Sequence, residues 1–217
     1  MQNIFVPPHD PILLKVAAKV DPNEIASKEI RKIVESMFQI AYGEQKDAKK
    51  PVMVGLAAPQ IGISKRIILV DVGANGINPP NPLSVKGVPR GAGDLRIYIN
   101  PEIVWQSEEE GEWYEGCYST DRVCGIVSRP TKIKVRALNR EGESIEEEYE
   151  GYTARIFLHE IDHLDGKVFV DHITDDEKLH WVEKDEFPLY RNNEGWRDWS
   201  KKCTRREWKQ LKNGTLH

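Results

Sequence analysis

The chain has 217 residues, of which 31 are Lys or Arg and 35 are Asp or Glu, so its formal net charge is −4. A chain of this length can enclose one sizeable core, and its acidic balance argues against a protein dedicated to nucleic acid, so we expect no DNA partner. No apolar run approaches the roughly 20 residues of a membrane helix, so we expect no membrane partner. Three cysteines and an N-terminus unlike a secretory signal predict a cytoplasmic protein without a disulfide framework.

The first predicted element is a helix that begins at residues 21–24. The sequence Asp-Pro-Asn-Glu there puts a capping side chain before a proline at the first helical position. Apolar residues then recur at helical spacing as far as Ala41, and Gly43 is the predicted end. Residues 67–72 are apolar and predict a buried strand, whereas the Gly- and Pro-rich stretch 73–93 predicts a long loop.

The second half of the chain combines short strands with one helix. Residues 132–138 alternate apolar and basic side chains, which is typical of a half-buried strand. A helix is predicted over residues 152–164, and Gly166 ends it. The other predicted strands are 96–100, 102–106, 111–114, 144–149 and 168–170. Strands flanked by two helices, without regular βαβ alternation, indicate an α+β fold.

The strongest functional signal is the sequence His-Glu-Ile-Asp-His, which begins at His159 on this predicted helix. Residues four apart lie on one helix face. His159 and His163 can therefore bind one transition metal while Glu160 lies beside it as a general base. The alternative is two histidines retained for packing, but the preceding Ile-Phe-Leu indicates a buried helix, where unliganded imidazoles would be costly.

Two histidines leave at least one metal ligand unassigned, and the residues alone leave two candidates open. Glu183 would complete a zinc peptidase whose third ligand is a later carboxylate, although this residue lies in an acidic stretch typical of an exposed surface. Cys117 would supply a thiolate, which is a strong ligand for zinc and for ferrous iron. A lone cysteine is nevertheless more often a small buried apolar residue.

Three segments, taken in order, resemble the signature motifs of the peptide deformylases. They are Gly55–Gln60 (GLAAPQ), Glu115–Ser119 (EGCYS) and His159–Gly166 (HEIDHLDG). The resemblance covers roughly residues 4–173, and the order of the motifs makes it far more specific than one HExxH sequence. It implies antiparallel sheets packed around a central HExxH helix, with an N-terminal helix. The implied reaction removes the formyl group from the initiator methionine of nascent polypeptides and releases formate, so N-formylmethionyl peptides are the implied substrates.

The resemblance also implies a metal centre. Cys117, His159 and His163 would hold one divalent metal ion and leave a position open for water. The family suggests Fe²⁺ in the cell, and this ligand set also suits Zn²⁺ or Ni²⁺. Glu160 would take a proton from the water and pass it to the leaving amine.

Three further roles follow from the same resemblance. The side-chain amide of Gln60 and the backbone N–H of Tyr118 would donate hydrogen bonds to the oxygen on which negative charge develops. Gly55 would let the substrate backbone lie alongside as an added strand.

The sequence departs from the usual bacterial pattern at Met53, Tyr118 and Arg155. The family usually has glycine, leucine and an apolar residue at these positions, and the last of them lines the pocket for the methionine side chain. Arg155 therefore belongs to the predicted substrate site, where a buried guanidinium needs a polar or anionic partner, and a reduced preference for methionine is expected. A deformylase-like protein that only binds N-termini is a further alternative, which the retained Glu160 and Gln60 disfavour.

The C-terminal residues differ in composition from the rest. Residues 191–212 carry eight basic and three acidic side chains and three of the six tryptophans. We divide the chain into a peptide deformylase-like catalytic domain, 1–174, and a C-terminal extension, 175–217, predicted to be helical. The extension is either a basic surface that binds the ribosome or an amphipathic helix packed on the domain. The spacing of Trp196 and Trp199 favours the packed helix.

Overall fold

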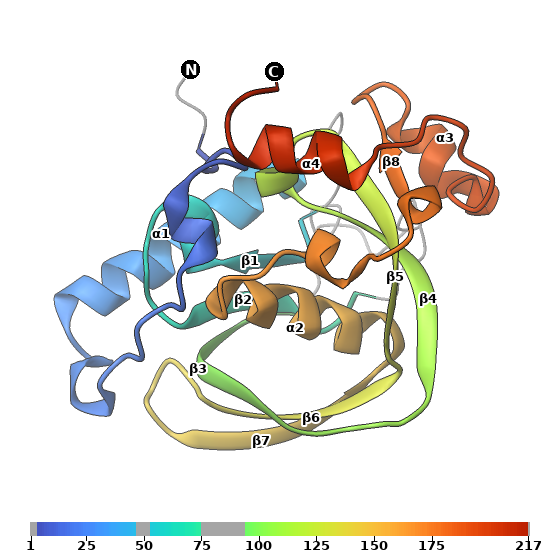
Figure 1. Cartoon of the computed structure of the whole chain (residues 1–217). Helices are drawn as coiled ribbons and strands as arrows, with labels where there is room; N and C mark the ends of the chain where they lie inside the picture. Colours follow the sequence, from blue (N-terminus) through green and yellow to red (C-terminus); the bar gives the residue numbers. More distant parts are fainter. Residues whose placement is uncertain (1–3, 47–52, 75–93, 217) are drawn as a thin grey trace.

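The computed structural model describes residues 4–46, 53–74 and 94–216 (Figure 1). Its helices are α1 (Lys28–Lys46), α2 (Gly151–Leu164), α3 (Phe187–Arg191) and α4 (Arg205–Lys212). Its strands are β1 (Gly55–Ala57), β2 (Ile67–Asp71), β3 (Leu95–Gln106), β4 (Glu110–Gly116), β5 (Val123–Pro130), β6 (Lys132–Leu138), β7 (Ser144–Glu150) and β8 (Leu179–Trp181). None of the described helices combines the length and apolar character that crossing a lipid bilayer requires.

The described strands form two antiparallel sheets, which confirms the predicted α+β class. The larger sheet has the order β1-β2-β3-β6-β7, and the smaller sheet has the order β4-β5-β8. Within the described residues β1 pairs only with β2, and β4 pairs only with β5. Each sheet therefore ends in a strand with one unpaired edge, and these two strands belong to the segments that carry the predicted site.

The HExxH helix, α2, lies in the middle of the molecule with the larger sheet curved around it, as the family resemblance implies (Figure 1). One face of α2 is apolar and places Phe157, which is fully buried, and Ile161 against the sheet. Their neighbours in this core are Ile68, Tyr98, Ile133 and Val135, from β2, β3 and β6. Because this apolar face packs against the sheet, the face that carries the two histidines points away from the sheet.

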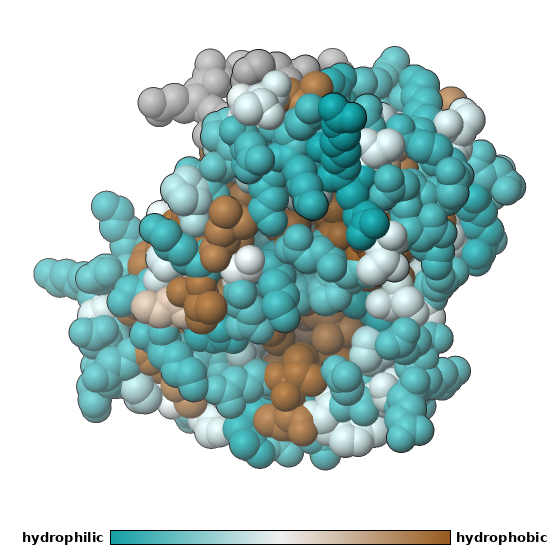
Figure 2. All heavy atoms as spheres, viewed as in Figure 1, coloured by the Kyte–Doolittle hydropathy of each residue, from teal (hydrophilic) through white to brown (hydrophobic). Residues whose placement is uncertain are grey.

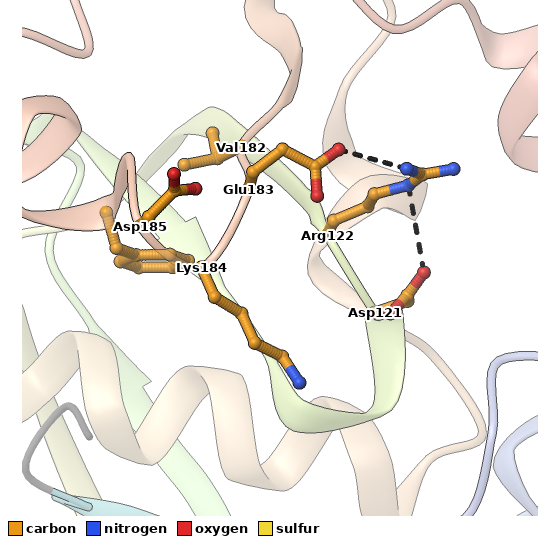
Figure 3. Close-up of a pocket in the computed structure, with 7 residues that line it drawn as sticks. Asp121, Arg122, Val182, Glu183, Lys184 and Asp185 are labelled. Atoms are coloured by element: carbon orange, nitrogen blue, oxygen red, sulfur yellow. Dashed lines mark hydrogen bonds and ion pairs between the residues drawn. The ribbon is translucent and has the colours of Figure 1, made fainter. Parts of the chain in front are cut away.

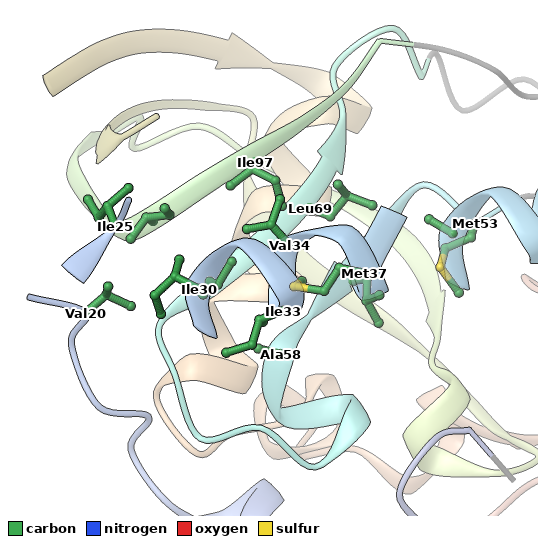
Figure 4. Close-up of a cluster of buried hydrophobic side chains, with 14 of the residues drawn as sticks. Val20, Ile25, Ile30, Ile33, Val34, Met37, Met53, Ala58, Leu69 and Ile97 are labelled. Atoms are coloured by element: carbon green, nitrogen blue, oxygen red, sulfur yellow. The ribbon is translucent and has the colours of Figure 1, made fainter. Parts of the chain in front are cut away.

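Strand β2 is covered on both faces. Ile67 and Leu69 pack against α1, and Ile68 and Val70 pack against the core around α2. Because both faces are buried, the strand reads as a continuous apolar run instead of an alternating one. Figure 4 shows the α1 side of this arrangement, where the side chain of Met53 is buried in the same cluster.

Helix α1 begins and ends later than the sequence predicts. Asp21 caps a separate 3-10 turn, Pro22–Glu24, so the capping side chain does not start the α-helix. The helix starts after Ser27, whose hydroxyl accepts the N–H of Ile30. Gly43 lies inside α1 and does not end it. Both predicted boundaries are therefore wrong, although the apolar stripe of the helix is confirmed.

The strand predicted at residues 168–170 is also wrong. These residues enter a 3-10 turn, Phe169–His172, in which the carboxylate of Asp171 accepts the N–H of Val168. The side chain of Asp171 thus gives the backbone of this segment a local hydrogen-bond acceptor in place of a neighbouring strand.

Two neighbouring predicted strands, 96–100 and 102–106, are one strand, β3, with a bulge between them. Asn100 has a φ of 52°, and the register with β6 shifts at this point. The sequence reading missed β5, the central strand of the smaller sheet. The loop predicted at residues 73–93 lies outside the described residues from residue 75 onward.

The C-terminal extension packs closely on the rest of the chain. Its strand β8 pairs with β5, and its buried Trp196 contacts Trp113 and Tyr114 of β4. Trp196 lies in a turn and Trp199 in irregular backbone, so neither lies on the helix face that their spacing indicates. In α4, Trp208 packs in a core cluster that includes residues of β5 and of the 3-10 turn at 169–172.

Replacement of Trp208 by alanine is expected to lower the free energy of unfolding by about 3–5 kcal/mol, because it empties a large buried site. Urea denaturation followed by circular dichroism measures this loss. The matched control is Arg206→Ala on the exposed face of α4, which should change stability by less than about 0.5 kcal/mol. Equal stabilities for the two variants would contradict the described packing of α4.

Candidate metal centre and active site

Cys117, His159 and His163 meet at the junction of the two sheets. Cys117 directly follows β4, and the histidines occupy successive turns of α2, with their ring centroids 5.1 Å apart. The Sγ atom of Cys117 lies 3.3 Å from Nε2 of His163. Among the described residues these three form the one group of potential ligands whose donor atoms all lie within 4.8 Å of one another. The structure thus brings together the three predicted metal ligands.

The electrostatics of this cluster suit a cation. Burial raises the pKa of Cys117, but the charge of His163 and hydrogen bonds from both histidines outweigh it and hold that pKa well below the usual thiol value. Burial lowers the pKa of His159, but hydrogen bonds with Cys117 and Glu115 outweigh it and hold that pKa well above its usual value. These contacts favour the thiolate, the form of cysteine that binds a divalent transition metal.

The backbone around Cys117 also directs its sulfur. The N–H of Ser119 points at the Cys117 Sγ atom at 3.4 Å, and the carbonyl of Cys117 accepts the N–H and the hydroxyl of Thr120. These contacts form the short 3-10 turn Tyr118–Thr120. Tyr118, whose backbone N–H is the predicted donor, is the first residue of this turn.

Glu115 orients His159 from the side opposite the sulfur. Its Oε2 lies 2.8 Å from Nδ1 of His159, which leaves Nε2 for a metal. The carboxylate also accepts two hydrogen bonds from Arg129, at 2.9 and 3.0 Å, and one from Arg155 at 2.8 Å. Arg129 in turn pairs with Asp162, at 2.7 Å. Two guanidiniums and two carboxylates thus neutralise one another in this buried cluster.

The sequence analysis missed the roles of Glu115 and Arg129. Glu115 belongs to the EGCYS motif. It lies on β4 two residues before Cys117, and in extended backbone this spacing places both side chains on one face. That spacing is a signal that could have identified it. Arg129 carries no comparable signal, because its contact with Glu115 depends on the pairing of β4 with β5.

Arg155 has the anionic partner that the sequence analysis required. Besides Glu115, its guanidinium donates to the carbonyls of Val127 and Gly111. The side chain therefore links α2 to both β4 and β5. Only 8% of the residue is exposed, so this polar group is buried and fully engaged.

Gln60 is held in one orientation. Its Oε1 accepts the N–H of Ala57 at 2.7 Å, which fixes which end of the amide is the oxygen. Its Nε2 consequently points at the Cys117 Sγ atom, 3.2 Å away. The residue is only 3% exposed, so the amide N–H groups are directed at the metal cluster and not at bulk solvent.

Glu160 and Gly55 are in direct contact. A Cβ atom built on Gly55 would lie 2.3 Å from Oε1 of Glu160, so only glycine leaves room for this carboxylate. The Oε2 atom of Glu160 is buried and makes no hydrogen bond with the described residues. Burial raises the pKa of Glu160 to about 7, against the opposing charges of His159 and His163. A group with this pKa can accept and release a proton near neutral pH.

Glu183 lies away from this cluster. It forms an ion pair with Arg122, with Oε1 and the guanidinium nitrogen 2.9 Å apart, and its side chain is 48% exposed. Figure 3 shows the pair in a surface pocket that Lys184 and Asp185 also line. The alternative prediction that Glu183 is the third ligand of a zinc peptidase is therefore wrong, because the carboxylate is already paired at the surface.

Comparison with known proteins gives one consistent result. The family model for polypeptide deformylases matches residues 1–179. Peptide deformylase 1 of Ralstonia nicotianae is 39% identical over 165 residues, which are 76% of this chain and 82% of that protein. Peptide deformylase 1A, chloroplastic/mitochondrial, of Arabidopsis thaliana is 36% identical over 75% of this chain and 58% of its own length.

A solved structure with a bound peptide shares the fold. The class I type b peptide deformylase from Acinetobacter baumannii, solved with Met-Ala-Ser bound, superposes with a TM-score of 0.64 at 32% identity. The match covers 78% of this chain and 96% of that one. The probable peptide deformylase from Synechococcus phage S-SSM7 superposes with a TM-score of 0.60 at 31% identity.

The pKa of Glu160 predicts a pH-dependent stability difference in the metal-free protein. Because the folded-state pKa lies above the unfolded value, the protonated carboxyl contributes stability below about pH 4.5, and this is lost as the pH rises through about 7. As the pH rises from about 4.5 to about 7, the free energy of unfolding of metal-free Glu160→Gln should therefore increase by about 3 kcal/mol relative to that of the metal-free parent. Urea unfolding at a series of pH values measures the gain, and a constant difference would refute it.

Proposed function

The chain belongs to the polypeptide deformylase family, and we propose that the residues described above perform the family's reaction, the hydrolysis of the N-formyl group from nascent polypeptides. The observation that carries the proposal is the convergence of the Cys117 thiolate with two imidazoles of α2 beside the buried carboxylate of Glu160. Cys117, His159 and His163 would hold a divalent metal. When bound, that metal supplies a water molecule of lowered pKa and draws charge from the formyl oxygen.

The two unpaired strand edges provide a path for the peptide. Gly55 of β1 touches Glu160, and Gly116 at the end of β4 precedes Cys117, so both edges border the site. An extended peptide that adds to the β1 edge would bring its N-terminal formyl group to the metal, with backbone hydrogen bonds giving affinity independent of sequence.

The chain's own residues then handle charge and protons. The Nε2 group of Gln60 and the N–H of Tyr118 donate hydrogen bonds to the formyl oxygen as it becomes negative. Glu160 accepts the proton of the attacking water and delivers it to the amine nitrogen as the C–N bond breaks. The products are formate and a peptide with a free α-amino group.

Formate release from a formyl-Met-Ala-Ser peptide tests the proposal. The protein is purified anaerobically and loaded separately with Fe²⁺, Zn²⁺ or Ni²⁺, because ferrous iron beside a thiolate is readily oxidised and the residues suit all three metals. Cys117→Ser should abolish metal-dependent turnover, whereas Glu183→Gln should leave it unchanged. Turnover that survives loss of Cys117 would refute the assigned metal centre.

Gly55→Ala is expected to lower kcat about 10²-fold or more, because its methyl group would displace the carboxylate of Glu160. The matched control is Gly43→Ala, since a Cβ there meets nothing within 4 Å. Formate release measured with equal metal content in both variants separates this effect from metal loss. Full activity of Gly55→Ala would show that Glu160 does not need this space.

Arg155 favours a broader choice of first side chain than methionine alone. It occupies the position that usually lines the methionine pocket, and its guanidinium is fixed by Glu115 and two carbonyls. We expect kcat/KM for formyl-Met and formyl-Ala peptides to differ by less than about tenfold, since the polar group reduces the gain from burying an apolar side chain. A strong preference for methionine would contradict this expectation.

We propose that residues 175–217 are an extension added to the catalytic part, residues 1–174. This extension would contact the ribosome in the cytoplasm, where new chains emerge. Trp196 and Trp208 are buried and unable to stack on bases, so the contact would be electrostatic. Arg205 is paired with Asp176, but Arg206 and Lys209 of α4 are exposed. Hydrophilic side chains cover this part of the surface (Figure 2).

Co-sedimentation with ribosomes tests this contact. The double variant Arg206→Glu/Lys209→Glu should lose binding, and binding by the parent should fall as salt rises. The control is Arg31→Glu/Lys32→Glu, which reverses the charge of two exposed residues on α1. Equal loss in both variants would indicate a nonspecific effect of net charge and would contradict a contact through α4.

A further inference from the structure

The two hydrogen-bond donors assigned to the formyl oxygen come from different parts of the fold. Gln60 lies in the 3-10 turn after β1, which belongs to the larger sheet. Tyr118 lies in the 3-10 turn after β4, which belongs to the smaller sheet. No described ladder joins β1 to β4, so backbone pairing within a sheet does not fix the distance between these donors.

A dipeptide near the N-terminus contacts both donor segments. The ring of Phe5 stacks on the ring of Tyr118, with centroids 4.4 Å apart and planes inclined by 20°. The next residue, Val6, donates its backbone N–H to the carbonyl oxygen of Gln60 at 2.9 Å. Phe5 is only 7% exposed and belongs to the core cluster around α1, so the dipeptide is itself firmly anchored.

We propose that Phe5 and Val6 are positioning residues that fix the two formyl-oxygen donors relative to each other. The inference rests on the proposed function. The dipeptide touches neither the metal ligands nor Glu160 by any contact described above, and it acts through Gln60 and Tyr118. Preorganised donors stabilise a developing oxyanion only when their geometry is set before the reaction, so a fixed link between the two sheets matters for kcat.

The aromatic side chain of Tyr118 takes part in this arrangement. A flat ring gives Phe5 a face on which to stack, and a stacked pair restrains the orientation of both partners. The departure of Tyr118 from the family's usual leucine therefore has a consequence in this chain: the donor turn is coupled to the N-terminal segment through two rings.

The first test measures kinetics of Phe5→Leu, which keeps an apolar side chain in the core but removes the stacked ring. We expect kcat for formyl-Met-Ala-Ser to fall about tenfold, with KM changed less than about twofold, because the donors act mainly in the transition state. The control is Phe38→Leu, which removes another stacked ring of the same cluster, on Tyr42 of the same helix. Rates are normalised to bound metal. Equal losses of kcat in the two variants would overturn the proposal.

A double-variant cycle separates positioning from simple packing. In a Gln60→Ala background one donor is already absent, so Phe5→Leu should lower kcat by a clearly smaller factor than it does in the parent. A merely structural role would give the same factor in both backgrounds. Restoration of kcat by Phe5→Tyr, which keeps the ring, is also expected.

A second readout does not depend on activity. In ¹⁵N-labelled, Zn²⁺-loaded protein, the side-chain amide signal of Gln60 is assigned by its loss in Gln60→Glu. We expect Phe5→Leu to shift this signal and increase its mobility, and Phe38→Leu to leave it unchanged. If the protein fails to release formate, the proposed function fails while this measurement still decides the positioning role. An unchanged amide signal in Phe5→Leu would overturn it.

Discussion

The site depends on the hydrogen bonds that the buried carboxylate of Glu115 makes with its neighbours. This carboxylate joins β4, β5 and α2, because Arg129 and Arg155 donate to it from the last two elements and His159 of α2 contacts its second oxygen. Desolvating such charges is costly unless each is paired, and Asp162 completes the balance through Arg129. The cluster thus holds the smaller sheet against the metal-binding face of α2.

The geometry at the metal follows from this arrangement. Because Nδ1 of His159 faces Glu115, the other ring nitrogen, Nε2, is directed toward Cys117. Cys117 directly follows β4, and its side chain lies on the same face of the strand as that of Glu115. The larger sheet contributes the remaining groups: Gly55 makes space for Glu160, and Gln60 points its amide at the same sulfur. The proposed catalytic groups from the two sheets therefore converge on α2, and side-chain contacts, not a shared ladder, set their spacing.

Much of the site could be predicted from local sequence, because its parts are local patterns. The HExxH spacing identified His159 and His163, and the alternation at residues 132–138 matched β6 at both ends. The partners of Glu115 could not be predicted, since they depend on strand pairing between segments far apart in the chain. The start of α1 was missed for another reason: Asp21 satisfies its capping preference in a short turn, and Ser27 competes as the true cap.

The pairing of β8 with β5 has a consequence for how the enzyme matures. Residues 179–181 form the third strand of the sheet whose edge strand leads into Cys117. A chain still being synthesised can form this three-stranded sheet only after residues 179–181 have emerged, which is later than the HExxH helix, α2. The sheet that leads into Cys117 is therefore completed only after the helix that carries the two histidines has emerged.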